Sequence, residues 1–316
     1  MKIALIGAGS IGIAWAVVFT RAGYEVALQD PDAGRRGAAP GEIATRFRDL
    51  AGAGLYEGNI DAALARVSVH ADLAAAVADA GYVQENAPEV LDLKRNLFAD
   101  LDRLAPAEAV LASSSSAITT SAIASDLPGR GRCLVVHPGN PPFLVPAVEL
   151  VPAPFTAAAA VDRAEHLLRD CGMSPVRVKR EIEGFVFNRL QGAILREAYC
   201  LVRDGVISAS DLDRIVRDGL GLRWSVVGPF ETADLNVRGG LPAHATRMGE
   251  AYARMGAERG QHDPWTPNLV ERVAAERRAA LPFERWEERV RWRDSALATA
   301  LAARQRWPAW PPEEPS

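Results

Sequence analysis

The sequence predicts an α/β fold with a doubly wound, mostly parallel sheet, followed by a second, all-α domain at the C-terminal end. Short apolar runs alternate with helical patterns up to about residue 178, an alternation typical of consecutive βαβ units. Beyond Gly184 the apolar spacing is helical only. The chain has 316 residues, more than one hydrophobic core usually takes. We therefore expect domains at residues 1–184 and 185–316.

The first strand and helix are the clearest elements. Residues 2–6 are apolar, spaced glycines follow, and a helical pattern runs to Ala22, where Gly23 ends it. Further apolar runs predict strands at 25–29, 80–85, 109–112, 132–136, 145–151 and 175–178. Apolar spacings of three and four residues predict helices near 43–55, 93–104 and 157–169. The stretch 137–142 holds three prolines and a glycine, so it must form a loop between two strands.

Turn and capping signals mark the helices of the second domain. Ser208 stands three residues before Asp211, a capping-box spacing, and Pro229 suits a first helical turn. Gly219 and Gly221 are expected to follow the end of the helix that Ser208 opens. The tail 307–312 is too rich in proline for a helix, which predicts a loose or partner-docked end.

Composition and charge exclude several classes of partner. The net charge is −4 and the isoelectric point about 5.8, which gives no field to attract nucleic acid. No apolar run approaches the ~20 residues of a membrane-spanning helix. The three cysteines, Cys133, Cys171 and Cys200, have no CxxC spacing, so we expect neither a disulfide framework nor a metal site. A cytoplasmic protein with no nucleic-acid or membrane partner is expected.

A glycine-rich turn predicts dinucleotide binding. The segment Gly7-Ala8-Gly9-Ser10-Ile11-Gly12 follows a strand and opens a helix, as in Rossmann-type folds. There the first glycine permits the tight turn, the second lets the backbone approach the pyrophosphate, and the third allows close helix packing. The start of the helix supplies N–H donors for the phosphates. Asp30 ends the next strand 18 residues after the last glycine and should bond the adenine-ribose hydroxyls.

Two arginines leave the choice of coenzyme open at this point. The carboxylate of Asp30 would repel the 2′-phosphate of NADP, whereas Arg35 and Arg36 close by could neutralise it. A glycine turn alone would also suit any α/β protein. NAD is favoured by the combination of four features: the first strand, the helix after the glycine turn, the 18-residue spacing, and Asp30 at the end of the second strand.

Polar residues gather where the strands of a parallel sheet should end. His137, Asn140 and Glu149 flank the proline-rich loop, and the run Ser113–Ser116 ends the preceding strand. Open α/β sheets bind ligands at this edge. Hydride transfer from an alcohol without a metal needs a base with a near-neutral pKa, and histidine is the usual choice. Taken alone, however, a histidine such as His137 is more often a solvated or structural residue, Glu149 could be a surface acid at a strand end, and Asn188 could be an ordinary helix-start residue.

Three further motifs accompany the glycine turn and the Ser113–Ser116 run. They are Gln84-Glu85-Asn86-Ala87-Pro88-Glu89, His137-Pro138-Gly139-Asn140-Pro141 with Glu149, and Gly184-Phe185-Val186-Phe187-Asn188-Arg189-Leu190. Together these motifs resemble the 3-hydroxyacyl-CoA dehydrogenase family, and the resemblance covers the chain from Met1 to about Asn236. The segments 219–224, 228–230 and 235–236 resemble the branch of the family that includes lambda-crystallin and L-gulonate 3-dehydrogenase.

The resemblance implies a role for each candidate residue. His137 would be the general base, Glu149 would orient it, Ser116 would hydrogen-bond the substrate oxygen, and Asn188 would contribute from the helical domain. Cofactor-side positions near the nicotinamide ribose are implied for Glu85, Glu89, Lys94 and Ser114. At Ser114 the sequence departs from the family, whose members often carry asparagine there, and for Lys94 a surface helix charge is the alternative. The family also implies a homodimer through the helical domain.

The expected substrate is a free, short and polar 3-hydroxy acid, similar to L-gulonate, and not a CoA thioester. Residues 35–66 contain no lysine, where the family's CoA users tend to carry them. Arg223, beyond the glycine-flanked end of a helix, could pair bidentately with a substrate carboxylate. It could equally cap a helix or bind a partner subunit. A short-chain 3-hydroxyacyl-CoA dehydrogenase and a non-catalytic, crystallin-like NAD-binding protein are the remaining alternatives.

Overall fold

The computed structural model of the chain describes residues 1–260, 266–289, 292, 303 and 306. The chain divides into two compact units, Met1–Leu195 and Arg196–Ser316. Helix α8 (Phe187–Arg203) runs across this division. The expected domain boundary at residue 184 therefore stays a prediction.

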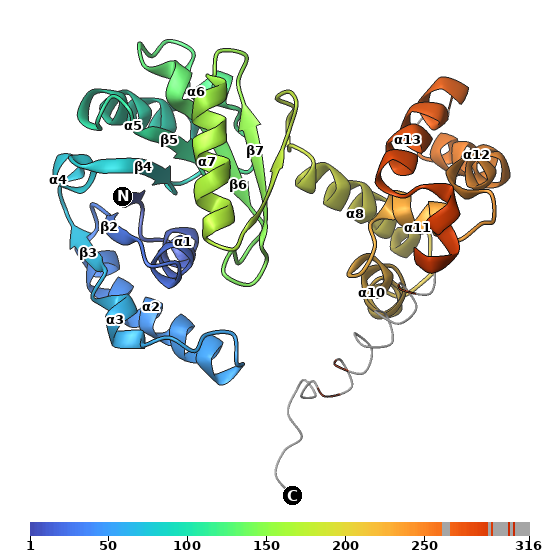
Figure 1. The fold of residues 1–316 in the computed structure, drawn as a ribbon, viewed down its shortest axis with the longest axis horizontal. Coiled ribbons are helices and arrows are strands. Elements are labelled where there is room, and N and C mark those ends of the chain that lie inside the picture. Colours follow the sequence, from blue (N-terminus) through green and yellow to red (C-terminus); the bar gives the residue numbers. More distant parts are fainter. Residues whose placement is uncertain (261–265, 290–291, 293–302, 304–305, 307–316) are drawn as a thin grey trace, which may run out of the picture. The chain divides into compact units, whose positions relative to one another are not determined.

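An eight-stranded sheet forms the centre of the first unit (Figure 1). Its order is β3-β2-β1-β4-β5-β6-β7-β8, in which β1 to β6 run parallel, β7 is antiparallel to β6, and β8 is parallel to β7. The prediction of a mostly parallel, doubly wound sheet is confirmed. The strands are β1 (Lys2–Ile6), β2 (Glu25–Gln29), β3 (Val67–His70), β4 (Ala80–Glu85), β5 (Val110–Ser113), β6 (Cys133–Pro138), β7 (Ala147–Pro152) and β8 (Ser174–Arg177).

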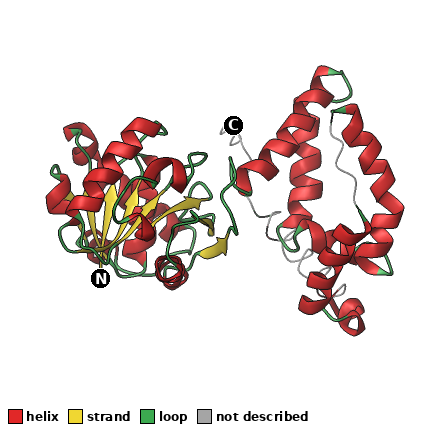
Figure 2. Ribbon diagram, turned by 90° about the horizontal axis from the view of Figure 1, so that it is seen from above, coloured by secondary structure: helices red, strands yellow, loops and turns green. Residues whose placement is uncertain are grey.

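Helices cover both faces of the sheet, as Figure 2 shows. Along β1, Ile3 and Leu5 join one hydrophobic core, while Ala4 and Ile6 join the other, because successive strand residues point to opposite faces. The first core is covered by α1 (Ser10–Arg21), α2 (Ala33–Gly52), α3 (Ile60–Leu64) and α7 (Ala158–Asp170). The second is covered by α4 (Leu73–Val77), α5 (Leu91–Leu104) and α6 (Thr120–Ala124), and a 3-10 turn, Arg130–Arg132, precedes β6.

Two local predictions for this unit are wrong. The edge strand β3 was not expected, because its sequence, Val-Ser-Val-His, is short and its side chains are only partly buried, so it lacks an apolar run. The proline-rich stretch does not begin as a loop: His137 and Pro138 belong to β6, and the chain leaves the sheet only at Gly139.

In the described residues of the second unit all regular secondary structure is helical, in agreement with the prediction (Figure 2). A small core joins its helices and consists of Val227, Leu235, Leu281 and Trp286. After α8 come α9 (Ala209–Ile215), a π-helical turn (Val216–Leu220), α10 (Gly221–Trp224), α11 (Pro229–Leu235), α12 (Gly240–Glu258), α13 (Pro267–Ala280) and a 3-10 turn (Phe283–Arg285).

The capping signals of this unit are confirmed, but its glycine signals are not. Ser208 Oγ accepts a hydrogen bond of 3.1 Å from the Asp211 N–H, and Pro229 opens α11. The glycines at 219 and 221 do not end a helix, because helical structure continues to Trp224. A Cβ at Gly221 would lie 3.0 Å from the Val216 carbonyl oxygen, so this glycine accommodates the wider π-helical turn. The proline-rich tail, 307–312, lies outside the described residues.

None of the helices in the described part of the chain is long and apolar enough to cross a membrane.

Candidate active site

The glycine-rich turn between β1 and α1 has the geometry of a phosphate cradle. Gly7 has a φ of 98°, a left-handed conformation that favours glycine, and a Cβ at Gly12 would stand 1.9 Å from the Gly7 carbonyl oxygen. At Gly9 a Cβ would meet nothing within 4 Å. The first bond of the helix runs from the Ile13 N–H to the Gly9 carbonyl, so the three preceding N–H groups have no acceptor in the helix. The open space and these donors fit a pyrophosphate.

Asp30 lies at the end of β2, beside this turn. One of its carboxylate oxygens accepts the Ala8 N–H at 2.7 Å and the other the Asp32 N–H at 2.9 Å. The two neighbouring arginines are held within the protein. Arg35 donates to the Ala8 carbonyl and to Glu42, and Arg36 donates to the carbonyls of residues 30 and 31. Protein oxygens thus bind all three nitrogens of the Arg35 guanidinium and Nη1 of Arg36.

A buried ion pair stands at the end of β4. The Lys94 ammonium on α5 lies 2.9 Å from Glu85 Oε1 and 3.0 Å from Oε2, and the two residues are 1% and 0% exposed. The same ammonium donates to the Ala87 carbonyl and lies 3.5 Å from Glu89 Oε2. Lys94 is therefore not the surface helix charge that was the alternative interpretation. Its donors are directed at protein oxygens, so its proposed contact with the cofactor is not supported by this geometry.

The Ser114 hydroxyl, like the Lys94 ammonium, is bound by groups of the protein itself. Its hydroxyl accepts from Trp15 Nε1 at 3.0 Å and from Gln84 Nε2 at 2.7 Å, and it donates to Asn86 Oδ1 at 2.8 Å. A hydroxyl has one donor and two acceptor positions, and all are used here. We therefore do not carry Ser114 forward as a side-chain contact of the cofactor. Sequence reasoning missed Trp15 as its partner, because that residue is 99 positions away on α1.

Glu89 organises the loop that presents Ser116. One of its oxygens accepts the Ser115 hydroxyl at 2.5 Å and the N–H groups of Ser116 and Ala117 at 3.0 Å each. Burial alone would raise the pKa of Glu89, but these hydrogen bonds and the nearby Lys94 hold it below its ordinary value. The Ser116 side chain is exposed, and its hydroxyl bonds to no other residue in the described part of the chain. Ser116 is thus free to meet a ligand.

His137 and Glu149 form a buried pair across two adjacent strands. In the antiparallel register of β6 and β7 the two residues stand directly opposite each other, so their side chains share one face of the sheet. His137 Nδ1 lies 2.8 Å from Glu149 Oε2, and the residues are 6% and 7% exposed. The alternatives of a solvated histidine and a surface acid are wrong. With Nδ1 on the carboxylate, Nε2 is the nitrogen left for a substrate.

The segment before α8 completes this group. Glu149 Oε1 accepts the Val186 N–H at 2.7 Å and the Phe187 N–H at 3.1 Å. Burial raises the pKa of Glu149, but the hydrogen bonds from His137 and from these two N–H groups outweigh it and leave the pKa below its ordinary value. Asn188 donates its side-chain N–H to the Ser116 carbonyl oxygen at 2.9 Å. The structure therefore brings His137, Glu149, Ser116 and Asn188 into one hydrogen-bonded neighbourhood of the first unit.

Two family models match the chain in succession. The NAD binding domain of 3-hydroxyacyl-CoA dehydrogenase matches residues 2–182, and the C-terminal domain of the same enzyme matches residues 184–286. The chain belongs to the 3-hydroxyacyl-CoA dehydrogenase family. It is thus a member of a family of NAD-dependent dehydrogenases that act on 3-hydroxyl groups, and the prediction of NAD as the cofactor is confirmed.

Members of this family resemble the chain over most of its length. A lambda-crystallin homolog from Bos taurus is 42% identical over 299 residues, 93% of each chain. L-carnitine dehydrogenase from Streptomyces griseus is 42% identical over 251 residues, 77% of this chain and 72% of the relative. The solved 3-hydroxyacyl-CoA dehydrogenase from Archaeoglobus fulgidus is 27% identical, with a TM-score of 0.68 over 92% of this chain and 98% of that one. The resemblance inferred from the motifs is confirmed.

Asn140 and Arg223, the other two residues expected to contact the substrate, form none of these hydrogen bonds in the described part of the chain. Asn140 is exposed in the loop that joins β6 and β7. Arg223 does not follow the end of a helix, as expected, but lies inside α10. Its Nε is buried and has no hydrogen-bond partner among the described residues. An unpaired buried guanidinium nitrogen is costly, so an anionic ligand would stabilise it.

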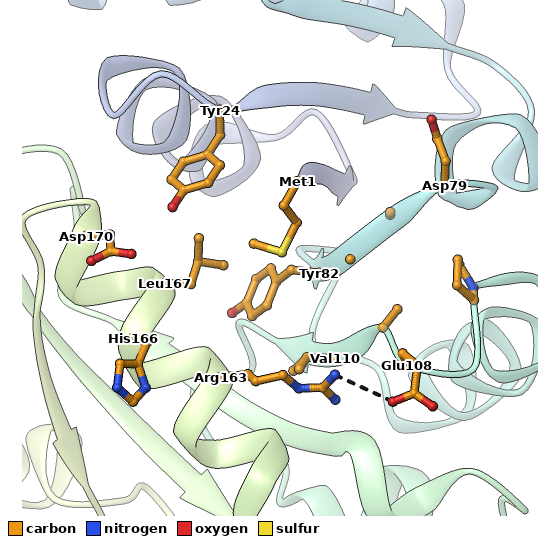
Figure 3. A pocket seen from close by; sticks show the side chains of 14 residues that line it. Met1, Tyr24, Asp79, Tyr82, Glu108, Val110, Arg163, His166, Leu167 and Asp170 are labelled. Atoms are coloured by element: carbon orange, nitrogen blue, oxygen red, sulfur yellow. Dashed lines mark ion pairs between the residues drawn. The ribbon is translucent and has the colours of Figure 1, made fainter.

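A hollow of about 500 Å³ opens at the amino ends of the parallel strands β4 and β5 (Figure 3). It is lined by residues at the beginnings of β4 and β5, by Tyr24 just before β2, and by α7. Arg163 on α7 faces Glu108 there at 3.8 Å. The cofactor and histidine residues lie instead at the carboxyl ends of the parallel strands, where such sheets bind ligands. This hollow contains none of the candidate site residues and has no part in the function proposed below.

Proposed function

We propose that this protein oxidises the 3-hydroxyl group of a small free 3-hydroxy acid, with His137 as the general base. The observation that carries the proposal is the buried His137–Glu149 pair, which directs Nδ1 to a carboxylate and leaves Nε2 for the substrate. The family and the phosphate-cradle geometry of the glycine turn supply the cofactor side.

Each residue of the candidate site has its own role in the proposed reaction. His137 Nε2 takes the hydroxyl proton as the carbon–oxygen bond gains double-bond character. The glycine turn of residues 7–12 would hold NAD⁺, which would supply the hydride acceptor. Glu149 stabilises the imidazolium that forms, and its own charge is held by the Val186 and Phe187 N–H groups. The Ser116 hydroxyl hydrogen-bonds the reacting oxygen, and Asn188 holds the Ser116 backbone in place.

Arg223 supports a free acid over a thioester. Its Nε–H is buried and unpaired among the described residues, and a carboxylate is the group that a guanidinium pairs with bidentately. An acyl-CoA substrate has a thioester in place of that carboxylate. The relative from Streptomyces griseus is named for L-carnitine, and we take a polar hydroxy acid as the substrate class here as well.

A panel assay tests the substrate. NADH formation is followed with L-gulonate, L-carnitine, 3-hydroxybutyrate and 3-hydroxybutyryl-CoA, and the free acids are expected to give the higher kcat/KM. The alternative, a short-chain 3-hydroxyacyl-CoA dehydrogenase, is favoured by the name of a fungal relative and would show the reverse order. A third possibility, an NAD-binding protein with a crystallin-like structural role, would bind NAD and turn over none of the panel.

Two substitutions test the site. His137→Gln should lower kcat by about 10²–10⁴ and leave NAD affinity nearly unchanged, because the base acts only on the substrate hydroxyl. A variant that keeps more than half of the wild-type kcat would remove His137 from the mechanism. Arg223→Lys should raise KM for the free acid more than about tenfold, because lysine cannot reproduce the planar fork. An unchanged KM would leave Arg223 without a role in substrate binding.

We also propose that two copies associate through the helical domain, as the resemblance implies, and that α8 forms part of the interface. This helix has no buried residue, and it exposes large apolar side chains, among them Leu190, Tyr199 and Val202. A second copy would cover such a face. Sedimentation should find a dimer for the wild type and a shift towards monomer for Tyr199→Glu. Leu55→Glu, an equally polar change at an exposed leucine outside α8, is the control and should remain dimeric.

The free thiols of Cys133, Cys171 and Cys200 support a reducing, cytoplasmic location as part of the same proposal.

A further inference from the structure

One residue beside the His137–Glu149 pair has an unusual backbone conformation. Phe185 has a φ of 50°, and it is the single non-glycine residue with a positive φ in the described part of the chain. An L side chain is strained in this region, and such strain persists only where the surroundings enforce it. Gly184 immediately before it has a φ of 72°. Two successive left-handed residues therefore form the turn that leads into α8.

This turn aims two backbone donors at one oxygen. The next two N–H groups, of Val186 and Phe187, both reach Glu149 Oε1. The other oxygen, Oε2, is occupied by His137 Nδ1. The carboxylate is thus held from both sides, and it cannot rotate away from the imidazole without losing the backbone bonds. The orientation of the histidine depends in this way on the conformation of residues 184 and 185.

The Phe185 ring packs against the same pair. It is 0% exposed, and its centroid lies 5.5 Å from that of the His137 ring. It also forms a core with Val135, Val151 and Val178. Val135 precedes His137 by two positions on β6, and Val151 follows Glu149 by two on β7, so all four point to one face of the ladder. The ring fills the space beside the pair on that face.

We propose that Phe185 is a positioning residue for the proton transfer: its left-handed turn and its buried ring together orient Glu149 and, through it, His137. A glycine at this place would adopt the turn without strain but would remove the ring. An alanine would retain the backbone strain and lose the packing that offsets it. Phenylalanine meets both requirements because the apolar contacts of its ring enforce the conformation that its backbone needs. The inference rests on the proposed function of His137.

Two substitutions separate the ring from the turn. Phe185→Ala removes the ring, with Phe185→Leu as the variant that keeps apolar bulk should the alanine variant not fold. Gly184→Ala adds a Cβ at a left-handed position while keeping the ring; its nearest neighbours would be 3.7 Å away, so the backbone conformation alone is perturbed. Phe98→Ala is the matched control, because Phe98 is 1% exposed in the other core of the same unit.

The first readout does not depend on turnover. The proton on His137 Nδ1, shielded from water and bonded to Glu149, should give a downfield imidazole resonance in the proton NMR spectrum, and His137→Gln identifies it by its loss. We expect the resonance to broaden or disappear in the Phe185 and Gly184 variants and to persist in Phe98→Ala. A resonance unchanged in Phe185→Ala, or in Phe185→Leu and Gly184→Ala, would overturn the proposal.

The second readout is kinetic. With the best substrate of the panel, kcat should fall roughly 10- to 100-fold in Phe185→Ala while KM for NAD stays within about twofold, because the base is misplaced and the glycine turn is untouched. Phe185→Leu should recover part of the loss, and Phe98→Ala should keep the wild-type kcat per folded molecule. A normal kcat together with an altered resonance would overturn the catalytic consequence. Full activity in His137→Gln would instead overturn the proposed function and leave the NMR result as the test of the orientation.

Discussion

Removing Lys94 should destabilise the protein far more than removing an exposed lysine. The change Lys94→Met leaves the Glu85 carboxylate buried without its cation, although the Ser113 hydroxyl at 2.5 Å and the Ala87 N–H at 2.6 Å remain. Loss of one partner of a buried pair costs about 3–5 kcal/mol. Because those two hydrogen bonds still serve the charge, we expect the lower end, about 3 kcal/mol.

The thermal consequence follows from the size of the unit. For 150–250 residues each kcal/mol shifts the melting temperature by about 2–4 °C, so Lys94→Met should lower it by roughly 6–12 °C. Lys2→Met is the control. It breaks the Lys2–Asp79 pair, whose acid is 70% exposed, and should change the free energy of unfolding by less than about 1 kcal/mol.

Urea and thermal unfolding followed by circular dichroism at pH 7 measure both variants. The double variant Glu85→Gln, Lys94→Met removes both charges and should recover more than half of the lost stability, since the buried carboxylate is gone. A loss below about 1 kcal/mol in Lys94→Met would refute the reasoning. NAD affinity tests the other interpretation, in which Lys94 contacts the cofactor directly. That interpretation predicts that Lys94→Met loses NAD affinity tenfold or more at an unchanged melting temperature.

Three further outcomes are expected. Gly12→Ala should abolish NAD binding or folding, as measured by calorimetry and circular dichroism, because the new Cβ cannot share space with the Gly7 carbonyl oxygen 1.9 Å away. Glu149, whose pKa is depressed from 4.5, contributes stability that is present above about pH 4.5 and lost as pH falls through the folded-state value, so Glu149→Gln should lose less melting temperature than the wild type on acidification from pH 6 to 3. In the native protein a thiol reagent at pH 8 should modify Cys200 first, and fast modification of three thiols would contradict this. Cys133 and Cys171 should react more slowly, because burial raises the pKa of each of these thiols to about 12.

The elements that could be predicted from the sequence are those specified by local patterns. The glycine turn and the strand and helix around it depend on neighbouring residues, and they appear where expected. The edge strand β3 could not be found, because a partly exposed strand needs no apolar run. Gly219 and Gly221 led to the wrong prediction of a helix end. A Cβ at Gly221 would lie 3.0 Å from the Val216 carbonyl oxygen, and a Cβ at Gly219 would meet nothing within 4 Å, so neither glycine terminates the helix.

In the candidate site, too, the sequence indicated the residue types but not the contacts between residues distant in the chain. The residue types of His137 and Glu149 suggested a base and its partner, but only the strand register places them face to face. The sequence did not indicate that Lys94 is buried, because its partner Glu85 comes from a strand and not from the same helix. Phe185 stood inside a recognised motif, yet the role proposed for it depends on a backbone angle that an L residue disfavours and that the motif did not indicate.

The hairpin of β6 and β7 places the His137–Glu149 pair on its strands and the residues of the connecting segment outside them. His137 and Glu149, the proposed base and its carboxylate partner, are fixed by the strand ladder, whereas the connecting segment from Gly139 to Pro146 lies outside it. The segment carries Asn140, a proposed substrate contact, so insertions or replacements there would change that contact without disturbing the pair, as long as the ladder keeps its register. Under the proposed function, substrate specificity could in this way evolve while the His137–Glu149 pair stays unchanged.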